Sequence, residues 1–282
     1  MDLSDVSEIL EAALREDVGS GDVTAAFTPN RCIRAEITAN SSGVISGLEE
    51  AILLFKNHKV AAKAHVKDGA SVEKGQKVLT LEGLARDLLP VERTALNFIS
   101  RMSGVSTATR EYADALKKHG SKAKIVATRK ATPGLMRLEK KAVKLGGGLT
   151  HRMGLYDMIL IKDNHLLLYG GDVGAALADA MRAKGGLKVE AEVETVKDAV
   201  LAAEGGADLI MFDNIGPSDI SEAIRILKEK GLRKKILLEV SGGVTLGNIG
   251  EYAGLDVDWI SSGRLTTAAP WLDYSLHILK EK

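Results

Sequence analysis

The sequence predicts an α/β protein in which a β/α barrel follows a smaller mixed α/β domain. From about residue 122, short apolar runs alternate with helix-like stretches, which is typical of a parallel sheet with right-handed crossovers. Before residue 110 the pattern is different and contains turn pairs typical of hairpins. A hydrophobic content of 45% in 282 residues is enough to form a core in each part.

Residues 1–110 are expected to form the mixed α/β domain. Residues 64–83 contain Asp-Gly and Lys-Gly pairs that separate short strands, as in hairpins. Periodicity predicts further strands near 34–39 and 43–46, and helices over 4–15, 48–58 and 90–117.

Residues 111–269 are expected to form the barrel, and six strands are clear in its pattern. They are expected over 124–127, 158–161, 188–193, 209–212, 235–240 and 259–261. Most are separated by predicted helices, over 135–145, 172–184, 195–205, 217–230 and 246–252. Six strands are fewer than a complete eightfold barrel requires. The last segment, 270–282, is predicted to be a helix that can pack back on the N-terminal domain.

The composition argues against several classes of protein. The 38 basic and 38 acidic residues balance, whereas a general nucleic-acid binder normally has a basic surplus. The single cysteine, Cys32, excludes an internal disulfide framework and a CxxC zinc site. No apolar run approaches the roughly 18 to 20 residues that span a membrane, and the first residues resemble an acidic amphipathic helix rather than a signal peptide. We therefore expect a cytoplasmic protein without nucleic-acid or membrane partners.

Positive charge is concentrated in one stretch of this neutral chain. Residues 124–165 contain nine Lys or Arg residues against three acids. Part of this excess has a simple explanation, because Arg137, Lys140, Lys141 and Lys144 fit the solvated face of a helix. Lys124 begins a predicted strand, and the other four cations, at 129, 130, 152 and 162, fall at loop or strand-end positions. A local excess of this kind indicates a binding site.

The predicted strand ends carry the candidate site residues. In a β/α barrel, ligands bind at the carboxyl ends of the strands. The residues at or just beyond these ends are Arg129, Lys130, Lys162, Asp163, Glu192, Asp213, Asn214, Ser241, Gly242, Gly243 and Gly263, and His151 and Arg152 follow a glycine run.

These residue types suit a small ligand with several negative groups. Arg binds carboxylate or phosphate bidentately and Lys supplies a point charge. Glu192 and Asp213 suit a metal ion or sugar hydroxyls, and the turns at 241–243 and 262–263 can offer backbone N–H groups to phosphate. Structural explanations remain open, since residues 146–148 could be only a helix cap, and Glu190 or Glu192 could be only a barrel-lining acid. The sequence has no GxSxG, paired HxxxH or Walker motif.

Seven motifs, in order along the chain, resemble the quinolinate phosphoribosyltransferase family, also called nicotinate-nucleotide pyrophosphorylase (carboxylating). They lie at 14–24, 92–107, 128–165, 190–195, 211–214, 239–244 and 260–266. The longest reads TRKATPGLMRLEKKAVKLGGGLTHRMGLYDMILIKDNH, and the shortest is MFDN. The resemblance covers nearly the whole chain.

The resemblance implies a fold, a reaction and an assembly. The fold would be a mixed α/β domain plus an incomplete barrel of about seven strands. The reaction would transfer phosphoribose from phosphoribosyl pyrophosphate to quinolinate with loss of CO2, a step of NAD biosynthesis that uses Mg2+. The protein would be a homodimer or a larger homo-oligomer whose active site is completed by the neighbouring subunit.

The resemblance also implies roles for individual residues. Arg93 would reach the site of the neighbouring subunit. Quinolinate would be bound by Arg129, His151, Arg152 and Lys162. Phosphoribosyl pyrophosphate would be held by Lys130, Glu192, Asp213, Ser241, Gly242, Gly243 and Gly263. Lys130, Lys162, Glu192 and Asp213 would be catalytic, and Glu192 and Asp213 would contact the metal indirectly, through water or pyrophosphate.

Other assignments share parts of this pattern. A molybdate-transport-associated paralogue has the same fold. A nicotinate phosphoribosyltransferase would not need Arg93, Arg152 and Lys162 to hold two carboxylates. A carrier module is a third alternative, since residues 66–83 superficially resemble a lipoyl hairpin domain, although no modified-lysine hairpin is evident.

Three positions depart from the family pattern. Ala127 and Ala131 flank the Thr-Arg-Lys motif where the family usually has Asp and Thr, and Thr267 replaces a histidine on the phosphate side. Arg264 introduces a new cation near that last position. We infer that Arg264 takes over the anion contact of the missing histidine.

Replacing Arg264 with alanine should therefore raise the KM for phosphoribosyl pyrophosphate, because the substitution removes the substituting cation. Steady-state kinetics with that substrate varied would measure the effect. An unchanged KM would show that Arg264 does not make the contact.

Overall fold

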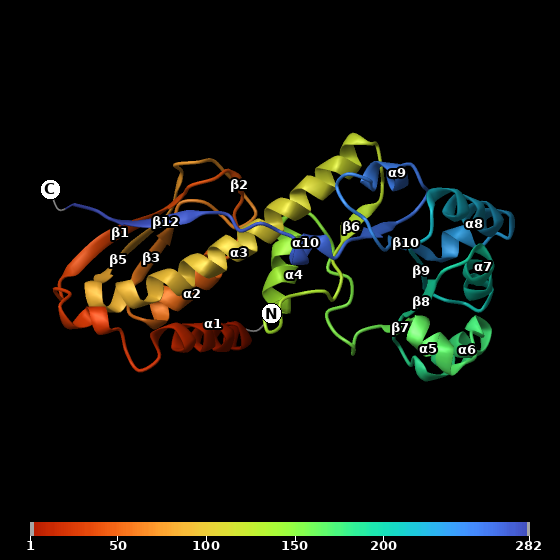
Figure 1. Ribbon diagram of the computed structural model, residues 1–282, viewed down its shortest axis with the longest axis horizontal. Coiled ribbons are helices and arrows are strands. Elements are labelled where there is room, and N and C mark those ends of the chain that lie inside the picture. Colours follow the sequence, from red (N-terminus) through yellow and green to blue (C-terminus); the bar gives the residue numbers. More distant parts are fainter. Residues whose placement is uncertain (1–2, 281–282) are drawn as a thin grey trace. The chain divides into compact units, whose positions relative to one another are not determined.

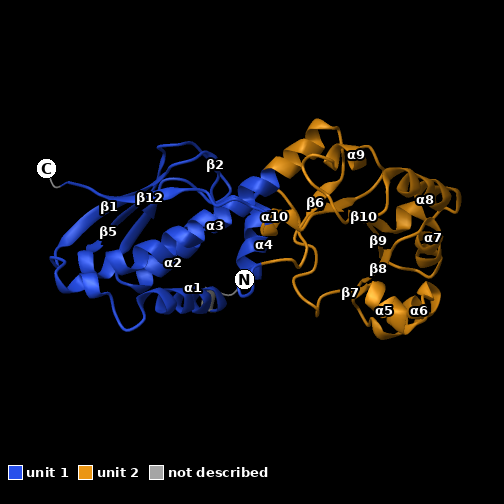
Figure 2. Ribbon diagram, in the orientation of Figure 1, with its two compact units in different colours: residues 1–110, 132–146, 268–282 blue, residues 111–131, 147–267 orange. Residues whose placement is uncertain are grey.

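Helices and strands alternate along the computed structural model, which describes residues 3–280 (Figure 1). The chain divides into two units, coloured blue and orange in Figure 2. Unit 1 comprises Met1–Arg110, Thr132–Gly146 and Ala268–Lys282, and unit 2 comprises Glu111–Ala131 and Gly147–Thr267. No helix in the described part of the chain is long and apolar enough to cross a membrane.

Unit 1 is built on a four-stranded antiparallel sheet in the order β12-β1-β5-β3. Along β1, every second residue from Ile33 to Ala39 is buried, because successive side chains of a strand point to opposite faces. α2 packs against β3 and α1 packs against α2. The elements that begin in this unit are α1 Leu3–Val18, a 3-10 turn Val23–Ala26, β1 Cys32–Ala39, β2 Gly43–Val44, α2 Leu48–Asn57, β3 Ala61–Ala64, β4 Ser71–Val72, β5 Lys77–Leu84, α3 Ala85–Lys118, α4 Met136–Leu145 and β12 Tyr274–Ile278.

The C-terminal segment corrects one prediction. Residues 270–282 were expected to form a helix, but the segment contains the strand β12, which pairs antiparallel with β1 from Ala35↔Ile278 to Ala39↔Tyr274. The sequence Tyr-Ser-Leu-His-Ile alternates apolar and polar residues with a period of two, which is a strand pattern. β1 provides the unpaired edge that this short strand needs.

The helix predicted at 135–145 is also assigned differently. The predicted barrel domain, 111–269, includes this helix, but α4 belongs to unit 1. The reason is electrostatic, because its buried Glu139 pairs with Arg101 of α3 at 2.6 Å, and Lys141 pairs with Glu50 of α2 at 2.8 Å. Breaking a buried pair is costly, so these pairs hold α4 to unit 1. The predicted boundary at residue 110 therefore omits an inserted segment, 132–146.

Unit 2 contains a six-stranded parallel sheet in the order β6-β11-β10-β9-β8-β7. Ser241 at the end of β10 lies beside Asp213 at the end of β9, so the carboxyl ends of these strands are level. The strands are β6 Lys124–Val126, β7 Ile159–Ile161, β8 Val189–Val193, β9 Leu209–Asp213, β10 Leu237–Ser241 and β11 Trp259–Ser261. All six lie where the sequence predicts them.

The barrel is incomplete, and its seventh position is a single residue. Leu149 forms one parallel bridge with Val126 of β6, and its N–H donates to the Ile125 carbonyl at 2.9 Å. The described sheet therefore begins at Leu149 and ends at β7. The expectation of about seven strands thus corresponds to six strands and one bridge.

The helices of unit 2 are amphipathic and bury their apolar faces. α8 buries Ile220, Ala223, Ile224 and Leu227, which follow helical spacing. The helices that begin in this unit are α5 Asp163–Leu168, α6 Val173–Ala183, α7 Val196–Glu204, α8 Pro217–Glu229, a 3-10 turn Arg233–Lys235, α9 Ile249–Ala253 and α10 Arg264–Thr267.

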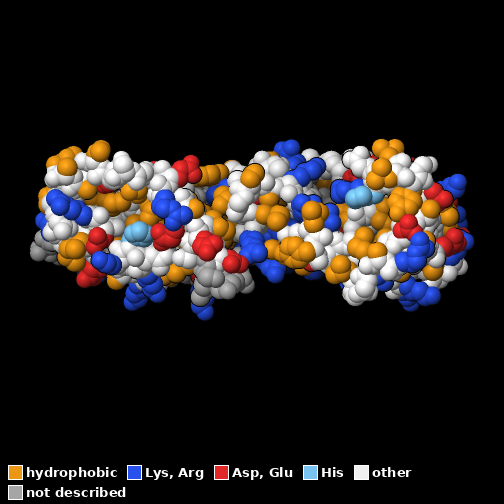
Figure 3. Space-filling view, turned by 90° about the horizontal axis from the view of Figure 1, so that it is seen from below, with side chains coloured by type: hydrophobic (Ala, Val, Ile, Leu, Met, Phe, Trp, Pro, Cys, Tyr) orange, Lys and Arg blue, Asp and Glu red, His pale blue; other side chains and the backbone are white. Residues whose placement is uncertain are grey.

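Charged side chains of both signs are mixed on the surface. Figure 3 shows basic and acidic groups interspersed with apolar ones on the face that it draws, in keeping with the balance of 38 basic and 38 acidic residues. A mixture of this kind does not create the single-signed field that attracts nucleic acid. That nucleic acid is not a partner remains a prediction.

Replacing Gly104 with alanine should destabilise unit 1. A Cβ at this position of α3 would lie 1.8 Å from the Pro270 carbonyl oxygen and 3.3 Å from Trp271 Cα, so the C-terminal segment would have to move. We expect a loss of about 1–3 kcal/mol in the free energy of unfolding, measured by urea titration, although alanine is the better helix former. Gly254→Ala, where a Cβ meets nothing within 4 Å, is the matched control. Equal stability of the two variants would contradict the close approach.

Candidate functional site

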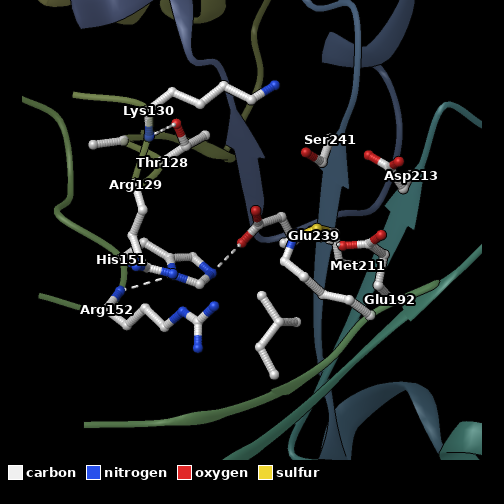
Figure 4. Close-up of a pocket in the computed structure, with 13 residues that line it drawn as sticks. Thr128, Arg129, Lys130, His151, Arg152, Glu192, Met211, Asp213, Glu239 and Ser241 are labelled. Atoms are coloured by element: carbon white, nitrogen blue, oxygen red, sulfur yellow. Dashed lines mark hydrogen bonds and ion pairs between the residues drawn. The ribbon is translucent and has the colours of Figure 1, made fainter. Parts of the chain in front are cut away.

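A cavity of about 360 Å³ lies in unit 2 and gathers residues from the carboxyl ends of its strands. Since parallel strands all end at one edge of the sheet, residues far apart in sequence meet there. Figure 4 shows their side chains directed toward a common space. The lining residues are Ala127, Thr128, Arg129, Lys130, His151, Arg152, Leu160, Lys162, Glu192, Met211, Asp213, Glu239 and Ser241.

Most of the site residues predicted from the sequence line this cavity. They include the four cations predicted for the site in the stretch 124–165, and the acids Glu192 and Asp213. Those in the lining are Arg129, Lys130, His151, Arg152, Lys162, Glu192, Asp213 and Ser241.

The other seven predicted residues, which include Asp163 at the start of α5 and Asn214 just after β9, are not in the lining. A Cβ on Gly263 would lie 3.0 Å from Lys130 Cδ, so this glycine directly adjoins a lining residue. Gly242 and Gly243 follow β10 with positive φ angles of 86° and 61°. Arg264 is exposed at the start of α10, and Arg93 is exposed on α3 in unit 1.

Lys162 and Glu192 form an ion pair across the cavity. Lys162 follows β7, Glu192 belongs to β8, and Nζ lies 3.2 Å from Oε2. Burial raises the pKa of Glu192, the charge of Lys162 opposes that rise, and the charge of Asp213 adds to it. Glu192 therefore lies within the electrostatic range of both a cation and a second carboxylate.

Asp213 is oriented by its neighbour. The side-chain amide of Asn214 donates to Oδ2 of Asp213 at 2.9 Å, and Asn214 has a φ of 54°. A Cβ on Gly242 would lie 2.7 Å from the Asn214 backbone nitrogen. The glycine is therefore required for the close approach of the two strand ends that places Asp213.

Backbone contacts hold the basic loop after β6. The Lys130 N–H donates to Oγ1 of Thr128 at 3.1 Å, and the Thr266 hydroxyl donates to the Lys130 carbonyl. Arg129 lies near enough to Arg152 to affect it, because burial and then the charge of Arg129 lower the pKa of Arg152. The cavity thus concentrates cations that repel one another, which prepares it for an anionic ligand.

A buried cluster of His151, Glu190 and Glu239 lies beside these cations. Nε2 of His151 is 3.0 Å from Oε2 of Glu190 and 3.3 Å from Oε2 of Glu239, and the three side chains are 6%, 0% and 1% exposed. The ring nitrogen Nδ1 accepts the backbone N–H of Arg152 at 2.8 Å. Burial tends to lower the pKa of His151, but the two carboxylates outweigh burial and raise it to about 9.

The location of the extra proton follows from these contacts. Because the Arg152 N–H already occupies Nδ1, that nitrogen has no proton of its own. The ring proton is therefore on Nε2, and the additional proton implied by the high pKa is held by a carboxylate of the cluster. Burial, offset by His151 and reinforced by the charge of Glu239, raises the pKa of Glu190, in agreement with a proton held within the cluster.

Part of this site is not predicted from the sequence. The sequence predicts Glu190 only as a barrel-lining acid, and it does not predict Glu239 or Thr128. A signal for Glu239 was present, since it lies two residues before Ser241 on the same strand and so faces the same side. The contact with His151 has no local signal, because it joins residues 88 positions apart on different elements.

The stability of unit 2 should fall as the pH rises through about 9. A folded-state pKa raised from 6.5 to about 9 gives the cluster of His151, Glu190 and Glu239 a contribution that is complete below pH 6.5 and is lost as the pH passes about 9. The contribution is on the order of 3 kcal/mol at most. Urea titrations between pH 6 and 10 should show this decline in the native chain and a smaller one in His151→Asn. The same decline in both proteins would contradict the cluster's role.

Comparisons with known proteins identify the family of the chain. Residues 22–103 match the family described as quinolinate phosphoribosyl transferase, N-terminal domain, and residues 105–277 match its C-terminal domain. A probable nicotinate-nucleotide pyrophosphorylase [carboxylating] of Archaeoglobus fulgidus is 42% identical over 262 residues, covering 92% of this chain and 99% of the relative. The human nicotinate-nucleotide pyrophosphorylase [carboxylating] is 33% identical over 277 residues, covering 98% and 93% of the two chains.

Solved structures give the same result. The crystal structure of NadC from Streptococcus pyogenes superposes with a TM-score of 0.91 at 35% identity, covering 99% of both chains. A human nicotinic acid phosphoribosyltransferase shares only the fold, with a TM-score of 0.64 at 11% identity over 99% of this chain and 74% of that one. Two family matches that together span most of the chain, and relatives that cover 92% and 98% of it, assign the protein: it belongs to the quinolinate phosphoribosyl transferase family.

Proposed function

We propose that the protein transfers phosphoribose from phosphoribosyl pyrophosphate to quinolinate and releases pyrophosphate and CO2, forming nicotinate mononucleotide for NAD biosynthesis. One observation carries the proposal: the cavity brings together Arg129, Lys130, Arg152 and Lys162 at the strand ends of a neutral chain. Two anionic substrates must meet in a single site, and a local excess of cations offsets their mutual repulsion.

The quinolinate subsite is assigned to one side of the cavity. Quinolinate carries two carboxylates, and the paired arginines Arg129 and Arg152 offer bidentate contacts to them. Lys162 adds a point charge, and its contact with Glu192 limits its freedom. His151 contacts the backbone of Arg152, because Nδ1 of His151 accepts the Arg152 N–H.

The phosphoribosyl pyrophosphate subsite is assigned to Lys130 and the turns after β10 and β11. Gly242 and Gly243 both have positive φ, a backbone form that turns N–H groups toward an anion. Gly263 permits the close approach of Lys130. Ser241 and Arg264 complete this group of proposed phosphate contacts.

Glu192 and Asp213 fit an indirect role in holding Mg2+. Both are carboxylates, the ligand type that Mg2+ prefers, and the charge of Asp213 contributes to the raised pKa of Glu192. Mg2+ characteristically binds through one or two carboxylates, waters and substrate phosphates. When bound, Mg2+ would supply charge neutralisation on the pyrophosphate.

The residues then divide the chemistry between positioning and charge stabilisation. The pyridine nitrogen attacks C1 of the ribose, and the C1–O bond breaks with its electron pair leaving on pyrophosphate, where Lys130 offsets the growing charge. Glu192 and Asp213 stabilise the positive charge that develops at C1. In the pyridinium that forms, the bond from C2 to its carboxylate breaks, the electron pair stays on C2 beside the positive nitrogen, and a proton replaces CO2.

The assembly and location belong to the same proposal. Arg93 is an exposed cation on α3 of unit 1, and we propose that in a homodimer or larger oligomer it completes the site of the neighbouring subunit. A cytoplasmic location remains the prediction made from the sequence.

Two related activities are less well supported. A nicotinate phosphoribosyltransferase would bind one carboxylate, which does not account for two arginines in the cavity, and the solved human example shares only the fold. The molybdate-transport-associated paralogue lacks support among the named relatives, which are nicotinate-nucleotide pyrophosphorylases.

A single reaction set tests the proposal. Purified protein is incubated with Mg2+ and phosphoribosyl pyrophosphate and either quinolinate or nicotinate, and nicotinate mononucleotide and CO2 are measured. We expect both products from quinolinate and no nucleotide from nicotinate. Failure to turn over quinolinate would refute the proposal and direct attention to Ala127, Ala131 and Thr267.

A further inference from the structure

Glu190 and Glu239 are buried in a way that stability does not explain. Their side chains are 0% and 1% exposed, and their four carboxylate oxygens have no aligned hydrogen-bond partner among the described residues. Burying such groups is costly, and apolar residues of similar volume are often as stable or more so. Two acids in this condition at one place therefore call for a functional explanation.

The side chain that both acids approach is His151, and it joins three strands. Glu190 belongs to β8, Glu239 belongs to β10, and Trp259 of β11 packs edge-on against the imidazole with ring centroids 5.8 Å apart. His151 itself has a φ of 51°, which is uncommon for a residue with a side chain. It lies in the irregular segment between the bridge at Leu149 and β7. The contacts with Glu190, Glu239 and Trp259 together fix the position of the His151 imidazole.

The ring in turn determines the position of Arg152. Nδ1 accepts the Arg152 backbone N–H at 2.8 Å, so the orientation of the imidazole fixes the peptide that leads into the arginine. Arg152 is 8% exposed, lines the cavity, and has Nη1 3.4 Å from the Met158 carbonyl oxygen. A preorganised cation binds an anion without the cost of ordering a flexible side chain. The contacts thus run from the two carboxylates, through His151, to Arg152.

The same three residues have the spacing of a metal site, but the hydrogen bond at Nδ1 argues against one. Their ligand atoms lie within 4.8 Å of one another. A metal at Nε2 would require that nitrogen to be bare and the ring proton to be on Nδ1. Nδ1 instead accepts an N–H, so the proton is on Nε2 and faces the carboxylates.

We infer that Glu190 and Glu239 are positioning residues that act through His151 to hold Arg152 where it receives a carboxylate of the substrate. The inference deepens the proposed function and rests on it. The inference predicts that changes in the cluster affect the binding of quinolinate more than that of phosphoribosyl pyrophosphate. The cluster contacts Arg152 on the quinolinate side of the cavity and does not include the turns after β10 and β11 that are proposed to bind phosphate.

The first test compares Glu239→Gln and Glu239→Ala. Glutamine keeps the volume and one carbonyl acceptor for Nε2–H, whereas alanine removes the contact. We expect alanine to raise the KM for quinolinate by roughly 10- to 100-fold and glutamine by much less, because displacing a binding group by about 1 Å costs up to ~100-fold. The KM for phosphoribosyl pyrophosphate should change less than about twofold. Equal increases for both substrates would overturn the inference.

The second test is a double-mutant cycle with Arg152→Ala. If Glu239 acts through Arg152, then Glu239→Ala should add little to the loss already caused by Arg152→Ala. Independent, additive losses in kcat/KM for quinolinate would overturn the inference. Glu50→Ala is the matched control, since Glu50 is an equally buried acid, 2% exposed, in unit 1. It should lower stability without changing the KM for quinolinate, and a change as large as that of Glu239→Ala would overturn the inference.

The third test does not depend on turnover, so it separates failure of this inference from failure of the proposed reaction. Nitrogen NMR of ring-labelled histidine should show Nδ1 of His151 unprotonated in the native chain and mixed tautomers in Glu239→Ala. A protonated Nδ1 in the native chain, or an unchanged ring signal in the variant, would overturn the inference. One equivalent of bound metal that disappears in Glu239→Ala would also overturn it.

Discussion

Like charges confined in one cavity repel, and this constraint governs the arrangement of unit 2. The basic loop after β6 brings Arg129 close enough to Arg152 to contribute to the lowering of its pKa. Without counter-charges, such a group would be expelled into solvent or disordered. The chain supplies counter-charges on neighbouring strands, with Glu192 paired to Lys162 and Glu190 close to His151. The cations remain in place and retain their capacity to bind an anion.

The alternation of a β-strand distributes these acids. Glu190 and Glu192 are two residues apart on β8 and therefore face the same side of the sheet at successive levels. The upper acid, nearer the carboxyl end of the strand, meets Lys162 in the cavity lining, whereas the lower one is fully buried against His151. The five-residue strand β8 thus supplies Glu192 to the cavity lining and Glu190 to the buried cluster with His151.

Unit 1 depends on a similar use of buried charge. Glu139 accepts hydrogen bonds from Arg101 and from the backbone N–H and hydroxyl of Thr132, and it is 1% exposed. These contacts retain the segment 132–146 in unit 1, although the chain enters and leaves it from unit 2. An insertion of this kind does not interrupt the alternation of strands and helices along the sequence. The predicted domain boundary at residue 110 therefore does not include it. The C-terminal strand β12 was missed for a related reason, because it forms only where β1 offers an edge.

The sequence alone determined the rhythm of strands and helices, the gathering of cations between 124 and 165, and the placement of Lys162, Glu192 and Asp213 at strand ends. These features are local, since periodicity and position along a strand are properties of neighbouring residues. Only the tertiary structure decided that His151 faces Glu190 and Glu239 rather than the cavity alone. Contacts between residues distant in the chain depend on sheet order and on which edge stays open, and no short stretch of sequence encodes either.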